Sequence, residues 1–126
     1  MEKEIVKIDG VAENPGSSNH VVKSGGFRFF TNQLSADPKT GQIIPGDVTE
    51  QTIRAMDNLK YLVESCGSQM DNIVKVVVYM RDTSSKDKID AVCNRYFQPG
   101  QEPAKVCVRA PSSIEGVDVE IDAIAR

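Results

Sequence analysis

The chain has 126 residues, with 15 Lys and Arg against 18 Asp and Glu, a net charge of −3 and a pI near 5.1. A chain of this length is expected to form a single domain over residues 1–126. The acidic balance and the scattered basic residues argue against a nucleic-acid surface, which needs clustered Lys and Arg. No apolar run is long enough to span a membrane. We therefore expect neither nucleic acid nor a membrane as a partner.

The start of the chain and its cysteines predict a cytoplasmic protein. Three of residues 1–4 are charged, and no apolar segment typical of a secretion signal follows them. Cys66, Cys93 and Cys107 are odd in number and form no C-x-x-C pair. Reduced thiols without a disulfide framework are expected.

The predicted elements begin with a strand at 5–8, followed by a turn and a loop at 12–19. A hairpin is predicted over 21–31, and a tight turn over 37–41. A helix is predicted over 47–65. Asp47 is its expected N-cap, Glu50 completes a capping box, and Gly67 stands where a C-cap glycine belongs.

The second half of the chain predicts strands around another helix. Residues 73–80 are apolar in nearly every position, which favours a central strand covered on both faces. Ser84 or Ser85 is expected to cap a second helix that ends before Pro99. Strands follow at 105–109 and at 117–123, where strict alternation places Val117, Val119 and Ile121 toward the core.

This order of elements predicts an α/β (α+β) fold, with two helices on one face of a sheet. Two helices cover only one sheet face. If the other face carries apolar side chains it needs a partner, so we expect an oligomer.

Few residues are arranged for chemistry. His20 and Cys107 are a possible nucleophilic pair, but no local motif joins them, and a buried strand cysteine is the simpler interpretation. The single His and the widely spaced cysteines predict no metal site. Gly25-Gly26 has no phosphate-loop spacing and is interpreted as a hairpin turn.

Charged residues on the predicted strands are better candidates. Asp118, Glu120 and Asp122 share one strand face; they are either a solvated surface or the source of a general base at an interface. Lys105 and Arg109 either bind an anion or face solvent.

Five segments of the chain resemble the RidA/YjgF family of reactive-intermediate deaminases, from about residue 21 onward. These segments are Asp37-Pro-Lys-Thr-Gly41, Ala55-Met-Asp-Asn-Leu59, Ile73-Val-Lys-Val-Val-Val-Tyr-Met-Arg-Asp82, Pro103-Ala-Lys-Val-Cys-Val108 and Val119-Glu-Ile-Asp-Ala-Ile-Ala125.

The resemblance implies a chorismate-mutase-like (YjgF-like) sheet in a homotrimeric barrel, with clefts between subunits. It also implies hydrolysis of enamines or imines to 2-keto acids and ammonia without a cofactor. Glu120 would activate water, the backbone carbonyl of Cys107 would help to hold that water, and position 105 would bind the substrate carboxylate.

The proposed substrate-binding positions differ from the family pattern. Lys105 replaces an Arg, which would form a two-pronged contact with a carboxylate. The family's Gly-Pro-Tyr reads Gly16-Ser17-Ser18, and its Ser-Gly-Gln reads Thr31-Asn32-Gln33. Asp90 replaces a common Asn. The expected substrate-binding residues are Lys105, Asn32, Gln33, Ser18 and Asp90.

Two other functions remain open from the sequence. One is non-catalytic binding of a metabolite or a protein partner. The other is the endoribonuclease activity attached to some family members, against which the acidic charge counts.

Overall fold

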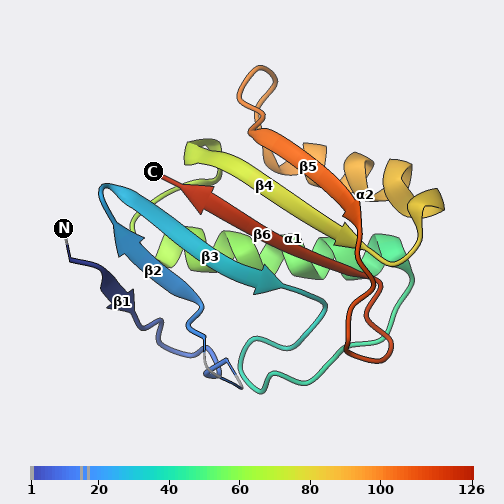
Figure 1. Cartoon of the computed structure of the whole chain (residues 1–126), viewed down its shortest axis with the longest axis horizontal. Coiled ribbons are helices and arrows are strands. Elements are labelled where there is room, and N and C mark those ends of the chain that lie inside the picture. Colours follow the sequence, from blue (N-terminus) through green and yellow to red (C-terminus); the bar gives the residue numbers. More distant parts are fainter. Residues whose placement is uncertain (1, 15, 17) are drawn as a thin grey trace.

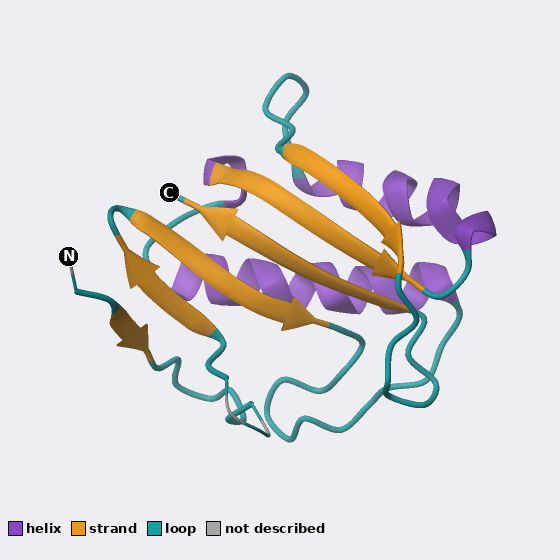
Figure 2. Cartoon of the chain, viewed as in Figure 1, coloured by secondary structure: helices purple, strands orange, loops and turns teal. Residues whose placement is uncertain are grey.

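The computed structural model describes residues 2–14, 16 and 18–126. These residues form an α+β fold, with a six-stranded sheet and two α-helices behind one of its faces (Figures 1 and 2). The elements are β1 (Glu4–Val6), β2 (Val21–Ser24), β3 (Phe27–Gln33), α1 (Val48–Ser65), β4 (Ile73–Met80), α2 (Lys86–Cys93), β5 (Ala104–Arg109) and β6 (Val119–Ala125), with short 3-10 turns at Met70–Asn72, Thr83–Ser85 and Asn94–Tyr96.

The strand order is β1-β2-β3-β6-β4-β5. β4 and β5 are parallel and the other pairs are antiparallel. A parallel pair needs a crossover connection, which here contains α2. The core lies between the sheet and the helices, where Met56 and Leu59 of α1 pack with Val78 and Ile121.

The predicted ends of α1 are confirmed. The Asp47 carboxylate accepts a hydrogen bond from the Glu50 amide at 2.8 Å, and the Asp47 amide donates to the Glu50 carboxylate at 3.0 Å. At the other end Gly67 has φ +84°, and the Ser68 amide donates to the Val63 carbonyl. This is the bond pattern of a glycine-terminated helix.

The predicted start of α2 is confirmed in the position of Ser85 as N-cap but not in a capping bond. Ser85 precedes the helix but makes no side-chain capping bond. Instead the Asp82 carboxylate accepts from the Ser84 amide at 2.9 Å and begins the 3-10 turn that leads into α2. The helix is also shorter than expected, because it ends at Cys93 and continues as a 3-10 turn.

Two strand boundaries differ from the prediction. The strand expected at 5–8 is β1 at Glu4–Val6, since only these residues pair with β2. The strand expected at 117–123 is β6 at Val119–Ala125, although Val117, Val119 and Ile121 are buried as predicted. The loop expected at 12–19 contains Pro15 and Ser17, which lie outside the described residues.

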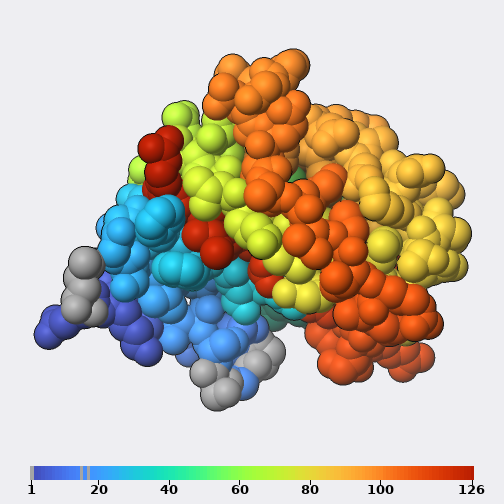
Figure 3. All heavy atoms as spheres, turned by 45° about the horizontal axis from the view of Figure 1, so that its top comes forward, coloured from blue at the N-terminus to red at the C-terminus, as the bar shows by residue number. Residues whose placement is uncertain are grey.

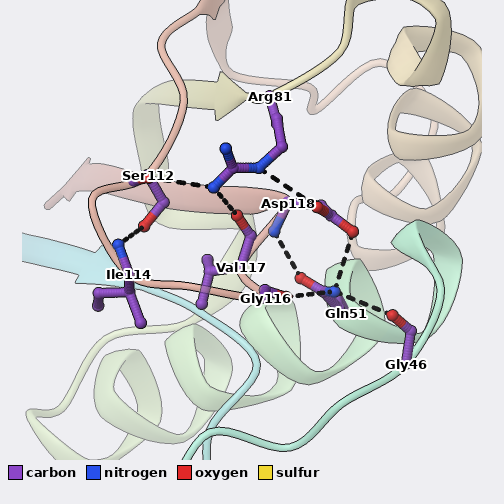
Figure 4. Close-up of polar contacts among 8 residues, drawn as sticks. All are labelled: Gly46, Gln51, Arg81, Ser112, Ile114, Gly116, Val117 and Asp118. Carbon is purple, nitrogen blue, oxygen red and sulfur yellow. Dashed lines mark hydrogen bonds and ion pairs between the residues drawn. The ribbon is translucent and has the colours of Figure 1, made fainter.

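A polar network holds the loop before β6 against α1 (Figure 4). The Gln51 side chain is 2% exposed, and its Nε2 lies 2.9 Å from the Gly46 carbonyl, 3.1 Å from the Gly116 carbonyl and 3.2 Å from the Asp118 carboxylate. Its Oε1 accepts from the Asp118 amide at 2.9 Å. Arg81 donates to the carbonyls of Ser112 and Val117. The network explains why residue 118 lies in the loop and not in β6.

The sheet face away from α1 and α2, called the open face below, carries apolar side chains. Phe27, Phe29 and Val106 are 40%, 43% and 41% exposed, and strand alternation places them opposite the core. Figure 3 shows β3, β6, β4 and β5, in cyan, red, yellow-green and orange, side by side at the surface. The expectation that β4 is covered on both faces is therefore wrong for the single chain.

Candidate functional site

The predicted base Glu120 lies on the open face. Its strand position pairs with Tyr79 of β4, and the Asn32 amide group donates to its Oε1 at 3.1 Å. Beside it, the Tyr79 hydroxyl donates to the Asp122 carboxylate at 2.7 Å. That hydrogen bond, with smaller effects of burial and carboxylate charge, raises the pKa of Tyr79 to about 12. Tyr79 is therefore a neutral donor near neutral pH, and Asn32 holds Glu120 in a fixed orientation.

The predicted anion-binding residue lies on the other face. Lys105 pairs in register with the buried Val76, so its side chain points toward α2. There its Nζ lies 2.5 Å from Asp90 Oδ1, and Lys86 Nζ lies 2.6 Å from Asp90 Oδ2. Cys107 Sγ is 3.9 Å from the same Oδ1. We call Lys86, Asp90, Lys105 and Cys107 the anchor cluster.

Cys107 is a poor nucleophile in this cluster. Burial raises the pKa of its thiol, and the Asp90 charge raises it further against the opposing effect of Lys105 and Lys86. A thiol in this state is largely protonated near neutral pH. The pairing with His20 considered from sequence is not formed: the contacts of His20 are with Ala12 and Gln33, while the side-chain partner of Cys107 is Asp90.

Asn32 and Gln33 line a cavity of about 140 Å³ together with His20, Asn58 and apolar side chains. His20 Nε2 donates to the Ala12 carbonyl at 2.9 Å, which leaves Nδ1 to accept from Gln33 Nε2 at 3.3 Å. Gln33 is 7% exposed and pairs with the buried Ile121, so it faces the core side and not Glu120.

The remaining predicted residues lie apart. Ser18 is exposed in the loop before β2 and accepts from Asn14 Nδ2 at 2.5 Å. Arg109 lines a surface hollow with Arg81, Asp82, Ser85 and Asp118 and is not among the contacts of Asp90. In the part of the chain that the structure describes, no three His, Cys, Asp or Glu residues are grouped to hold a metal ion. No helix there is long and apolar enough to cross a membrane.

The structure thus brings the predicted residues into two groups on opposite sheet faces. Asn32 and Glu120 form one group, and Asp90, Lys105 and Cys107 form the other. Lys86 was missed by the sequence reasoning, although its i, i+4 spacing from Asp90 was a signal for an ion pair on one helix face. Tyr79 was missed because its neighbour Asp122 follows from strand register, which the sequence does not show.

Comparison with known proteins agrees with this fold. Residues 12–126 match the family model described as Endoribonuclease L-PSP. A RutC family protein of Pyrococcus abyssi is 34% identical over 99% of this chain and 98% of its own length. The mouse protein named 2-iminobutanoate/2-iminopropanoate deaminase is 32% identical over 77% of this chain and 71% of its own. The structure of Escherichia coli TdcF with bound serine has a TM-score of 0.85 at 28% identity and covers 97% of both chains.

The fold and the two residue groups define a small α+β protein with a carboxylate on one sheet face and a paired lysine on the other. The family match extends over nearly the whole of this unit. The chain belongs to the Endoribonuclease L-PSP family, which is also called the RidA/YjgF family.

Proposed function

We propose that this protein hydrolyses reactive imines or enamines to a carbonyl compound and ammonia, without a cofactor. A substrate derived from an amino acid would give a 2-keto acid. Membership of a family that includes a protein named as an iminobutanoate and iminopropanoate deaminase supports the proposal. The observation that carries it is the Glu120 carboxylate, oriented by Asn32 on a sheet face that is otherwise rich in apolar side chains.

The reaction needs little from the protein beyond positioning. The carbon of an imine is already electrophilic, so water adds to it once a base accepts a proton. In this proposal Glu120 accepts that proton as the new C–O bond forms and passes it to the nitrogen, which gives a carbinolamine. The hydroxyl proton of the carbinolamine then moves through Glu120 to the nitrogen as the C–N bond breaks, which forms the C=O bond and releases ammonia. An enamine first takes a proton on carbon to become the imine.

A complete site in this proposal requires a second copy of the chain. Glu120 and Lys105 lie on opposite faces of one sheet, so one chain does not present both to a single small substrate. Exposed Phe27, Phe29 and Val106 make the open face a surface suited to burial against another subunit. We propose a homotrimer in which Glu120 of one subunit and Lys105 of its neighbour border one cleft.

The first test removes the proposed base. Glu120→Ala is expected to abolish the acceleration of imine hydrolysis, measured as competition with semicarbazide trapping of imines generated in the assay. Glu120 projects from the open face, so truncation should leave the core intact. Glu64→Ala, at an exposed position of α1, is the matched control. Full activity in Glu120→Ala would remove Glu120 from the mechanism, and ligand binding without any turnover in the wild type would indicate a non-catalytic protein.

The second test concerns the shared site. Glu120→Ala and Lys105→Ala are each expected to lose activity as pure oligomers. Mixed oligomers formed by co-expression contain some clefts with both native residues, and part of the activity should return. If mixed oligomers of demonstrated composition stay as inactive as the pure variants, the site is not built from Glu120 and Lys105 of different subunits.

A further inference from the structure

The Asp90 carboxylate already forms an ion pair with Lys105, which is the cation that the proposed site offers to a substrate. Its Oδ1 contacts Lys105 Nζ at 2.5 Å and its Oδ2 contacts Lys86 Nζ at 2.6 Å. The Lys105 side chain is 25% exposed and that of Asp90 is 21% exposed, whereas that of Lys86 is 51% exposed. Lys105 and Asp90 therefore form the more shielded half of the cluster, where water and salt screen charges less than at an open surface.

Asp90 carries its charge near neutral pH. Burial opposes its ionisation, but hydrogen bonds from Lys105 and Lys86 outweigh burial and hold the pKa below its usual value. The other titratable groups that face it are the Cys107 and Cys93 thiols, whose pKa values are raised by burial. Both thiols are neutral in the same range. Charge in the cluster is therefore set by Asp90 and the two lysines.

A substrate carboxylate at Lys105 would meet the Asp90 charge directly. An ammonium group has three donors, so Lys105 has the hydrogen-bonding capacity for a second acceptor. The obstacle is electrostatic, because two carboxylates on one ammonium group lie only a few ångströms apart and repel each other. A substrate without a carboxylate meets no such repulsion.

We propose that Asp90 is the specificity-determining residue of this site and that its carboxylate sets the site to accept imines and enamines that carry no carboxylate. The inference rests on the proposed function, since it assigns a substrate class to the same cleft. It reverses the expectation from sequence that Lys105 mainly serves as an anchor for 2-keto acids. In the ligand-free protein, Lys105 is an anchor that is already paired with a carboxylate of the chain itself.

Binding measurements test this inference without any turnover. Pyruvate and its uncharged ester methyl pyruvate are titrated calorimetrically into the wild type, Asp90→Asn and Asp87→Asn. The Asn side chain still offers an oxygen to Lys105 but no charge. We expect Asp90→Asn to bind pyruvate about tenfold more tightly than the wild type, a change of about 1.4 kcal/mol, with methyl pyruvate unaffected.

Asp87 is the matched control, because it lies on the same helix, is exposed and leaves the Asp90 contacts in place. Asp87→Asn should bind both ligands as the wild type does. Because both substitutions remove one negative charge, this control separates the effect of the Asp90–Lys105 contact from that of a change in net charge. The inference is overturned if Asp90→Asn and the wild type show the same preference between pyruvate and methyl pyruvate, including the case in which neither protein binds either ligand.

Turnover then separates this inference from the proposed function. The semicarbazide assay is run with 2-iminopropanoate, formed from alanine by an amino-acid oxidase, and with the imine that an amine oxidase forms from propylamine. The wild type should favour the propylamine-derived imine, and Asp90→Asn should shift toward 2-iminopropanoate. Absence of activity on both imines in every variant contradicts the proposed function, while the pyruvate binding ratio still decides the role of Asp90.

Discussion

Replacing Gln51 with Met tests whether the network at the start of α1 fixes the loop before β6. The two side chains are similar in length and volume, so the substitution removes the amide group while leaving little cavity. Gln51 is 2% exposed, and its amide contacts Gly46 before α1 and both Gly116 and Asp118 in the loop before β6.

The expected loss in the free energy of unfolding depends on which of the former partners of Gln51 can form hydrogen bonds with water instead. Gly46 and Gly116 are exposed, so water replaces the lost contacts to their carbonyls and each costs about 1 kcal/mol or less. The Asp118 amide loses its acceptor at a half-buried position, and an unsatisfied buried donor costs about 1–3 kcal/mol. We therefore expect Gln51→Met to lower the free energy of unfolding by about 2–4 kcal/mol.

Urea denaturation followed by circular dichroism is the assay, with all variants at one protein concentration because the proposed oligomerisation would contribute to stability. With a slope of about 1–3 kcal/mol per molar urea, the expected loss lowers the midpoint by roughly 0.7–4 M. Gln101→Met, at an exposed position after the 3-10 turn, is the control. A midpoint for Gln51→Met equal to that of Gln101→Met would refute the reasoning.

Three further predictions concern other parts of the molecule. Cys107→Ser should keep the imine hydrolysis rate within a fewfold of the wild type, since the thiol is protonated; complete loss in the semicarbazide assay would assign the sulfur a chemical role. Phe29→Asp should convert the proposed trimer of 3 × 13.8 = 41.4 kDa into a 13.8 kDa monomer by light scattering, while Tyr61→Asp, at an exposed position on α1, should keep the mass of the wild type; an unchanged mass for Phe29→Asp would exclude the open face from the proposed interface. Because the folded pKa of Asp90 is lowered, its ion pairs stabilise the protein above the unfolded pKa of about 3.9 and are lost as the pH falls through the folded value. As the pH falls below 5, Asp90→Asn should therefore lose less stability than the wild type. Identical profiles of unfolding free energy against pH for the two proteins would contradict this.

Local signals in the sequence were sufficient for most of the elements. The capping box at Asp47 and Glu50 and the glycine after α1 predict the helix ends because each depends on neighbouring residues alone. The capping bond before α2 was misjudged because Asp82 begins a 3-10 turn, and the choice between neighbouring polar residues depends on the geometry of that turn.

The sequence alone did not predict that the candidate site residues lie on two different faces of the sheet. Alternation in β6 places Glu120 opposite Val119 and Ile121, but the face that Lys105 shares with α2 depends on the register of the parallel β4–β5 pair. The contact between Asp90 and Lys105 joins the crossover helix to an edge strand, and it forms only after α2 has packed. Pattern alone therefore identified the residues but not their grouping.

The position of β6 affects how the sheet assembles during synthesis. β6 is last in chain order, yet it lies between β3 and β4. Without β6, neither β3 nor β4 has a partner at the edge where β6 lies in the folded sheet. Unpaired edges are prone to intermolecular pairing, and strand pairing over such long sequence separations is slow. The inner edges of β3 and β4 are therefore the surfaces that a chaperone would need to shield before β6 is added.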